Sequence, residues 1–555
     1  MHVVVTLGVG GGVHPPSCET SGVARVSRRG VLLGGAALTT GVAGAAHALP
    51  RVDVRPDLNR PEGAVDPRFP FDHLVVVMME NHSFDNYLGM LPRRGQPLAD
   101  GFTFGPDGTP TNRNPLPLAD GRRGHITVFP MPSVCQMESS PSQAWNASHQ
   151  QVDGGRMDGF LRAEGNTDCA MGYWDDATLP FYYSLASTFT LANRWFASAP
   201  CQTYPNRRFL MAGTAYGLVS SVVPGPFDKP PANGTIFDRL DAHGISWANY
   251  FTDLPQTVLI PQVAKNNPTK LRPLAELFTD CAAGTLPAVS FVDPDFGLAD
   301  VIGSHVPGDV IPPKERANGA DEENPQNVQL GEAFVARVVN AVMHGARWDR
   351  TLLVWTYDEH GGYYDHVPPP AAVRPDDIPP DIGPHDVPGG YDMYGLRVPA
   401  VVVSPYAKPR AVTDVVHDHT SVLATIEAWW NLPPMTRRDA AATTLLDFLD
   451  LSAPPAFLDP PTLKPAAVSS QKELACDTDD PGVKPVADVG AATHARPPRS
   501  PARRPTASAP GGSLAATGLD DALPEVALLG LAAAAAFSAR RRRPWPETAD
   551  LDTVT

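Results

Sequence analysis

Residues 74–85 read LVVVMMENHSFD, and this stretch decides the fold class of the chain. A short apolar run rich in valine changes abruptly to polar and acidic side chains. Such a run, with its β-branched residues, is typical of a strand that is buried on both faces of a sheet. Glu80 and Asn81 then stand at the carboxyl end of the strand, which is where α/β proteins place their ligand-binding groups.

The same arrangement recurs along the chain. Residues 352–362 read LLVWTYDEHGG, and shorter apolar runs occupy residues 288–292 and 400–403. Between and after these runs, apolar residues recur with helical spacing at residues 335–342 and 420–430. Strands that alternate with helices predict an α/β fold, in which a mostly parallel central sheet carries helices on both faces.

Acidic and amide side chains follow two of the predicted strands, at Glu80-Asn81 and at Asp358-Glu359. Adjacent carboxylates repel each other unless a cation neutralises them, and oxygen ligands suit a hard divalent cation. Two ordinary explanations stay open: Asn81 or Ser83 caps a helix, or the second group forms a solvated turn. Because the arrangement occurs twice, we favour a site for one divalent metal ion, whose identity the residues do not specify.

Residues 201–209 read CQTYPNRRF and form a candidate anion site. Pro205 is well placed near a helix start, where Arg207, Asn206 and the first N–H groups would face an anion. Thr203 is either an ordinary helix cap or a nucleophile whose hydroxyl a metal deprotonates. The residues alone leave both roles open.

Other polar candidates have less specific spacing. His366 follows two glycines that allow close approach of backbone or ligand, and it suits a metal ligand, a phosphate donor or a general acid. A histidine taken singly is more often structural or at the surface. The remaining candidates are His149, His305, His417, His419 and the acid pair Asp293-Pro294-Asp295.

Residues 1–48 predict an export signal. Residues 27–32 read SRRGVL, a small apolar run follows to residue 46, and Ala46-His47-Ala48 supplies an A-x-A cleavage site. This pattern is typical of a twin-arginine signal peptide, so we expect passage through the Tat translocase. The alternative is a transmembrane anchor, for which the run is short and rich in glycine and alanine.

Residues 514–555 carry a second targeting signal. Residues 514–518 (LAATG) precede the apolar run 526–537 and the basic stretch 540–543, an order that resembles an LAxTG-like sortase signal. The alternative is a transmembrane tail anchor whose arginines stay inside. Both explanations place the protein at the cell surface, and without a working anchor it would be secreted.

Composition bounds the rest of the chain. The net charge of −16 argues against nucleic acid as a partner, which would call for a basic surface.

Residues 477–513 are rich in Pro, Ala, Thr and Arg and predict a disordered spacer, so the catalytic domain is expected at residues 49–476. Five cysteines remain once Cys18 leaves with the signal, which leaves at least one unpaired within the chain, and no C-x-x-C motif indicates a thiolate zinc site.

Five motifs together resemble one known family. In chain order they are Glu80-Asn81-His82-Ser83-Phe84-Asp85, Thr203-x-Pro205-Asn206-Arg207, Asp358-Glu359-x-Gly361-Gly362, Asp365-His366-Val367-x-Pro369-Pro370 and Gly395-x-Arg397-Val398-Pro399. Over about residues 70–455 the chain is similar to bacterial phosphoesterases of the non-haemolytic phospholipase C and acid phosphatase type. The resemblance implies an alkaline-phosphatase-like α/β/α sandwich.

The resemblance also implies roles for particular residues. The family's Thr or Ser nucleophile falls on Thr203. The implied metal ligands are Glu80, Asn81, Asp358 and Glu359, with the hydroxyl of Thr203 as a further ligand. The implied histidines around the phosphoryl group are His366, His149 and His419. The expected mechanism has Arg207 and the helix start stabilise the phosphoryl oxygens while His366 protonates the leaving alkoxide.

Three positions depart from the family pattern. Glu359 stands where some family phosphatases carry Asp, and Asn193-Arg194 stands where Asp-Arg is frequent. Asn324-Pro325 stands where His-Pro is frequent, which puts one phosphate-facing histidine in question.

The expected activity is that of an exported phospholipase C, which cleaves a phospholipid on the diacylglycerol side through a phospho-threonine. The acidic charge favours a zwitterionic substrate such as phosphatidylcholine. The first alternative is a broad acid phosphatase acting on monoesters. The second is a wall-displayed binding protein with a degenerate site.

Overall fold

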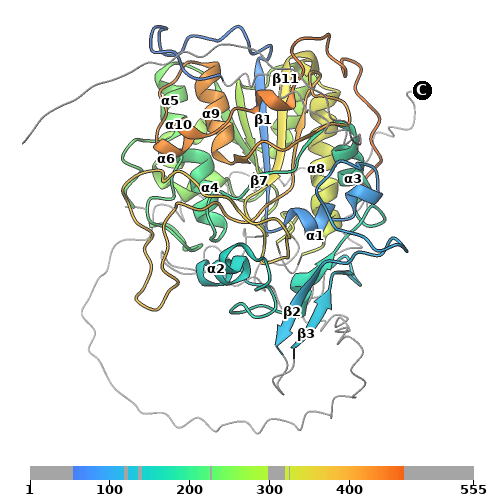
Figure 1. The fold of residues 1–555 in the computed structure, drawn as a ribbon. Helices are drawn as coiled ribbons and strands as arrows, with labels where there is room; N and C mark the ends of the chain where they lie inside the picture. Colours follow the sequence, from blue (N-terminus) through green and yellow to red (C-terminus); the bar gives the residue numbers. More distant parts are fainter. Residues whose placement is uncertain are drawn as a thin grey trace, which may run out of the picture. The chain divides into compact units, whose positions relative to one another are not determined.

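An eight-stranded sheet lies at the centre of the described chain (Figure 1). The structure is a computed structural model that describes residues 54–117, 123–135, 141–225, 228–297, 319–323 and 326–467. In spatial order the strands are β13 (Val412–Thr413), β6 (Thr190–Ala192), β12 (Ala400–Val403), β11 (Thr351–Tyr357), β1 (His73–Met79), β10 (Val289–Val292), β8 (Trp247–Phe251) and β9 (Leu271–Pro273). Only the pairs made by β12 are antiparallel among these strands, so the predicted mostly parallel sheet is confirmed.

Strand β1 contains the apolar stretch that the sequence singled out. All seven of its residues are buried, and it pairs in parallel with β11 on one side and β10 on the other. Leu74 lies opposite Leu352 and Val289. Because parallel neighbours end at the same edge of a sheet, the residues that follow β1, β10 and β11 come together there.

Helices cover both faces of the sheet, with α4 and α8 on opposite sides in Figure 1. One face carries α3 (Pro180–Thr188), α7 (Leu274–Ala283) and α8 (Val328–Met343), which contact β6, β8 and β11 respectively. The other carries α4 (Thr203–Ala212), α5 (Ile236–Ala242), α9 (Thr420–Trp429) and α10 (Arg437–Ala441), each in contact with another helix of that set. The predicted helices at residues 335–342 and 420–430 are α8 and α9, so the predicted α/β sandwich is confirmed.

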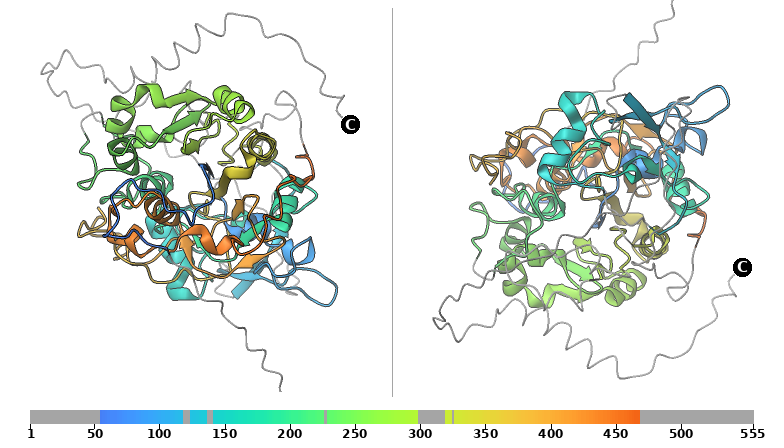
Figure 2. Two further views of the ribbon diagram at one scale, coloured as in Figure 1. Left: turned by 90° about the horizontal axis from the view of Figure 1, so that it is seen from above. Right: turned by 90° about the horizontal axis from the view of Figure 1, so that it is seen from below.

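The shorter elements lie around this framework. Helix α1 (Phe84–Leu88) follows β1, and α6 (Pro261–Asn266) lies between β8 and β9 in the chain. Figure 1 and the view from below in Figure 2 place α2 (Trp145–Val152) and the hairpin of β2 (Arg113–Pro117) and β3 (Arg123–Thr127) beyond the carboxyl end of β1. Two small pairs complete the strands: β4 (Phe129–Pro130) with β5 (Gly172–Tyr173), and β7 (Trp195–Phe196) with β14 (His417–Asp418).

The two edges of the central sheet are short. Strand β13 has two residues, and β9 has three, of which the last is Pro273. Proline has no N–H to donate to a neighbouring strand.

Several predicted segments lie outside the described residues. They are the signal peptide (1–48), the spacer (477–513), the sorting signal with its apolar run (514–555), His305 and Asn324-Pro325. Among the helices that the structure does describe, none combines the length and apolar character needed to cross a bilayer. Cys169, Cys201 and Cys281 are buried free thiols.

Candidate active site

Buried carboxylates gather at the carboxyl ends of three adjacent strands. Glu80 follows β1, Asp293 follows β10, and Asp358 and Glu359 follow β11, and each is at most 3 % exposed. The segment 319–323 adds two more, because carboxylate oxygens of Glu80, Asp321 and Glu323 lie within 4.8 Å of one another. The backbone N–H of Glu80 donates to the carbonyl of Asp321 at 3.0 Å, which fixes this segment beside β1.

Arg207 from α4 is the cation that contacts these acids. Its Nε lies 3.1 Å from Asp358 Oδ2, its Nη2 3.3 Å from Glu80 Oε1, and its Nη1 4.0 Å from Asp293 Oδ1. Burial alone would lower the pKa of Arg207, but the three carboxylates outweigh burial and raise it. The sequence placed Arg207 against phosphoryl oxygens, whereas in the structure its guanidinium engages protein carboxylates.

The carboxylates remain under-compensated by the described residues. Burial raises the pKa of Asp358 to about 7 and that of Asp293 to about 6, in both cases against the lowering effect of Arg207. Burial and the neighbouring Asp358 raise the pKa of Glu359 well above its ordinary value. Such shifts show that the ionised forms are penalised here, and a bound cation would relieve that penalty.

Asn81 and Thr203 complete the oxygen-rich cluster. The hydroxyl of Thr203 lies 3.3 Å from Oδ1 of Asn81, and the backbone N–H of Asn81 donates to Asp358 Oδ1 at 3.1 Å. Asn81 has φ = 69°, a left-handed conformation that a non-glycine residue rarely adopts. Its carbonyl packs on Gly361, where a Cβ would lie 1.9 Å from the carbonyl oxygen. A glycine is therefore required at position 361.

The helix-cap explanation for Thr203 is wrong. Thr203 is the first residue of α4, and Gln202 occupies the cap position without making a side-chain cap bond. The hydroxyl of Thr203 is thus available at the helix start, facing Asn81. Asn206, by contrast, donates to the carbonyls of Ala199 and Cys201, so it holds the preceding loop and does not face an anion.

The residues of this cluster fit a divalent metal ion. The donor set consists of oxygens from Glu80, Asn81, Thr203, Asp358 and Glu359, as hard cations prefer. Oε1 of Glu359 is buried and has no hydrogen-bond partner among the described residues. A cation bound there would satisfy that atom.

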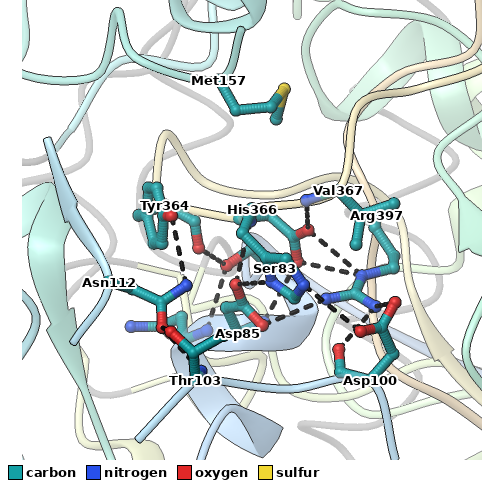
Figure 3. A network of polar contacts seen from close by, with 12 residues as sticks. Ser83, Asp85, Asp100, Thr103, Asn112, Met157, Tyr364, His366, Val367 and Arg397 are labelled. Atoms are coloured by element: carbon teal, nitrogen blue, oxygen red, sulfur yellow. Dashed lines mark hydrogen bonds and ion pairs between the residues drawn. The ribbon is translucent and has the colours of Figure 1, made fainter. Parts of the chain in front are cut away.

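A second acidic group lies nearby but is already neutralised (Figure 3). Oxygens of Asp85 and Asp365 and a ring nitrogen of His366 lie close enough together to hold one ion. Arg397, however, contacts Asp365 at 3.1 Å and Asp85 at 3.0 Å. A protein cation therefore already faces both carboxylates, although burial still raises the pKa of Asp365 to about 6.

The three predicted histidines lie in different surroundings. His419 is fully buried and donates from Nε2 to the backbone carbonyl of Asp358 at 2.7 Å. This hydrogen bond fixes the backbone of Asp358, one residue of the cluster. His149 donates from Nδ1 to the carbonyl of Trp145 at 2.7 Å, and burial lowers its pKa. No described residue hydrogen-bonds to Nε2 of His149.

His366 lies in the charge-balanced network. Its Nδ1 is 2.7 Å from Asp85, and its Nε2 is 3.3 Å from Asp100. Burial alone would lower the pKa of His366, but these two carboxylates raise it to about 10. Within the described chain no hydrogen bond links His366 with Thr203, so its part in leaving-group protonation stays a prediction.

Sequence reasoning missed some residues of the site. Asp321 and Glu323 follow no apolar run, and only a local excess of acid marks them. Asp293 belongs to the acid pair Asp293-Pro294-Asp295 after a predicted strand, a pattern of low specificity. The role of Arg397 has no local signal, since its partners lie about 30 and 310 residues away in the chain.

The fold and this site define a hydrolase that acts on phosphoric esters. The chain belongs to the phosphoesterase family, whose model matches residues 71–433. It is 30 % identical over 404 residues to non-specific phospholipase C1 of Arabidopsis thaliana, covering 68 % of this chain and 70 % of that protein. Phospholipase C B of Mycobacterium tuberculosis is 28 % identical over 426 residues, covering 69 % and 78 %.

Similar solved structures include an alkaline phosphatase superfamily protein from Vibrio parahaemolyticus, with a TM-score of 0.29 and 12 % identity over 65 % of this chain and 78 % of that one. A lipoteichoic acid synthase from Listeria monocytogenes has a TM-score of 0.32 and 8 % identity, over 70 % and 80 %. TM-scores this low do not establish a shared fold, so the fold is assigned from the topology of the sheet.

Proposed function

We propose that this chain is an exported, metal-dependent phospholipase C that hydrolyses phosphatidylcholine-type lipids to diacylglycerol and a phosphorylated head group. The observation that carries the proposal is the hydroxyl of Thr203, which sits at the start of α4 beside Asn81 in a cluster of buried oxygens. Phospholipases C among the family relatives support the substrate class, and the net charge of −16 supports a zwitterionic lipid.

The metal would be held by the five residues whose oxygens make up the cluster. They are Glu80, Asn81, Thr203, Asp358 and Glu359. A bound divalent ion supplies Lewis acidity, which lowers the pKa of a coordinated hydroxyl and polarises a phosphoryl oxygen. Arg207 contacts both Glu80 and Asp358 and would hold these two carboxylates in place.

Thr203 then acts as the nucleophile. Its hydroxyl gives up a proton to solvent, and Oγ1 bonds to phosphorus while the bond from phosphorus to the diacylglycerol oxygen breaks, which leaves a phospho-threonine. The N-terminus of α4 favours the negative charge that gathers on the phosphoryl oxygens. Water then attacks phosphorus, the bond from phosphorus to Oγ1 breaks, the phosphorylated head group leaves, and Oγ1 takes up a proton from solvent.

Two histidines with opposite protonation states suit the two proton transfers. Asp85 and Asp100 raise the pKa of His366, which favours its protonated form, and His366 is the proposed proton donor to the leaving alkoxide, for which its Nε2 would have to leave Asp100. Burial lowers the pKa of His149, which favours its neutral form, and its Nε2 is the proposed acceptor for the proton of the attacking water. Groups whose pKa values are driven apart by their surroundings commonly divide acid and base roles in this way.

The location is proposed from the sequence signals alone. The twin-arginine segment at residues 27–48 supports export through the Tat translocase, and the LAATG segment with its apolar and basic flanks supports sortase attachment at the surface.

Hydrolysis by residues 49–513 tests the proposal. We expect metal-dependent cleavage of p-nitrophenyl phosphorylcholine that exceeds cleavage of p-nitrophenyl phosphate. Thr203→Ala should lower kcat by about 10³-fold or more while the protein stays folded. Thr279→Ala removes an exposed hydroxyl of α7 and serves as the matched control.

Other outcomes point elsewhere. Preferential cleavage of the monoester, equally lost in Thr203→Ala, would keep the nucleophile and make the protein an acid phosphatase. No hydrolysis of either substrate by the metal-loaded protein would favour a binding role. Full activity in Thr203→Ala would remove Thr203 as the nucleophile.

A further inference from the structure

The network around Arg397 joins the two turns that carry the proposed metal ligands. The first turn, residues 80–85, contains Glu80 and Asn81, and the second turn, residues 358–367, contains Asp358 and Glu359. Both turns run directly into the network shown in Figure 3, at Asp85 and at Asp365-His366.

All three guanidinium nitrogens of Arg397 donate hydrogen bonds. Nε donates to both oxygens of Asp365 at 3.1 Å, and Nη2 donates to Asp85 Oδ1 at 3.0 Å. Nη1 donates to the backbone carbonyls of Asp100 and Asn193 at 2.9 and 3.1 Å. The side chain is completely buried, so no solvent competes for these bonds.

Further bonds link the two turns to each other directly. The backbone N–H of Asp85 donates to Asp365 Oδ2 at 3.2 Å, and the backbone N–H of His366 donates to Asp85 Oδ2 at 2.9 Å. Ser83 Oγ donates to the carbonyl of Tyr364 at 2.6 Å. The carboxylates of Asp85 and Asp365 therefore face each other across the two turns, and Arg397 forms an ion pair with each.

The first turn needs such support. Asn81 is held in a left-handed conformation, and backbone of this kind persists only where the surroundings enforce it. The carbonyl of Asn81 also packs on Gly361 of the second turn. A small separation of the turns would let Asn81 relax and would break the hydrogen bond from its backbone N–H to Asp358 Oδ1.

We infer that Arg397 is a positioning residue for the metal site: it clamps the two turns together so that their oxygens converge on one ion. The inference rests on the metal site of the proposed function. Lysine cannot replace arginine here, because a single ammonium group cannot bridge two carboxylates and two carbonyls at once.

Arg438 provides a matched control. It is also completely buried, and it donates to the backbone carbonyls of Ser198 and Tyr391 at 2.7 and 2.6 Å. It also donates to the carbonyl of Val373 and forms an ion pair with Asp418 at 3.5 Å, and none of these partners lies in either turn. A loss of stability that follows from replacing any buried arginine should therefore appear in both Arg397→Lys and Arg438→Lys. A loss of metal affinity should appear only in Arg397→Lys.

The test measures Mn²⁺ binding by calorimetry to metal-free wild type, Arg397→Lys and Arg438→Lys, well below the Tm of each. Amide exchange of the two turns is followed in the same samples. We expect Arg397→Lys to raise the Kd for Mn²⁺ at least tenfold and to speed exchange in both turns, and Arg438→Lys to stay within twofold of wild type. Activity lost in Arg397→Lys should return at high Mn²⁺. Asp365→Asn, which keeps the side-chain shape, replaces Arg397→Lys if the latter does not fold.

The outcomes separate the two proposals. Equal Kd values in wild type and Arg397→Lys would overturn the inference and leave the proposed function standing. An equal loss in both arginine variants would also overturn it, since the effect would then be general. Failure of the wild type to bind Mn²⁺ would overturn the metal site and the inference together.

Discussion

Gly361 is the residue at which the site tolerates least change. Alanine at this position would meet the cost of φ = 64°, about 1–2 kcal/mol, and its Cβ would also lie 1.9 Å from the carbonyl oxygen of Asn81. We expect Gly361→Ala to lower the free energy of unfolding by about 3 kcal/mol or more and to weaken metal binding. Urea unfolding and Mn²⁺ calorimetry measure the two effects.

Gly244 is the matched control for this change. It has φ = 65°, but a Cβ there would meet nothing within 4 Å. Gly244→Ala should therefore show only the conformational cost, about 1 kcal/mol, and no change in metal binding. Equal costs at the two positions would mean that the carbonyl of Asn81 yields freely to the added methyl group.

The sequence predicts those residues of the site that directly follow a strand. Glu80, Asn81, Asp358 and Glu359 could be placed in one cluster because parallel strands bring their carboxyl ends together. Contacts between distant loops leave no such trace. The structure alone shows that Arg207 faces carboxylates and that both ring nitrogens of His366 are engaged.

At the scale of elements, helix α3 depends on a residue of α8. The helix begins at Pro180, and its cap residue makes no side-chain bond. Oε1 of Glu332 instead accepts from the backbone N–H groups of Phe181 and Tyr182 at 2.7 and 3.1 Å. We expect Glu332→Ala to lower the free energy of unfolding by about 2 kcal/mol, because two buried donors would lose their acceptor.

Urea unfolding checks this prediction against an exposed acid. Glu276 lies in the first turn of α7 on the surface, so Glu276→Ala should cost only a few tenths of a kcal/mol. A similar cost for the two substitutions would show that water replaces the carboxylate of Glu332.

Long, buried helices and strands could be predicted from the sequence, whereas short ones could not. The apolar runs of β1, β10, β11 and β12 and the helical spacing of α8 and α9 identify these elements from the sequence. Strands β6 and β13 are too short to show a period, and β8 contains Asn249 and an alternation broken by aromatic residues. The antiparallel direction of β12 depends on a long connection whose path no local pattern specifies.

At the scale of the whole molecule, metal removal should destabilise the fold. A ligand that binds only the folded state stabilises it by about 2.7 kcal/mol at a concentration one hundred times its Kd. We therefore expect a chelator to lower the Tm at pH 7. Because burial and Asp358 raise the pKa of Glu359 well above its ordinary value, the neutral Glu359→Gln should melt close to the metal-free wild type while gaining less from added metal.

The pH dependence of the metal-free protein follows from the same carboxylates. Since folding raises the pKa of Asp358 to about 7, this carboxyl binds more protons in the folded than in the unfolded chain between about pH 4 and 7, and its contribution to stability rises as the pH falls. Buried histidines such as His82, whose pKa is lowered to about 3, act in the opposite direction, so the contribution is measured as the difference in Tm between wild type and Asp358→Asn in chelator. We expect the wild type to gain on Asp358→Asn as the pH falls, and a difference that does not change with pH would contradict the shift.

The short edges of the central sheet have a consequence for concentrated solutions. A second copy of the chain could pair with the sheet only along β13 or β9, which offer two and three residues, one of them a proline without an N–H. Long, flat edges invite strands of other molecules to extend a sheet, and natural proteins commonly blunt them in this way. Extension of the central sheet would therefore have to begin with local unfolding at these edges.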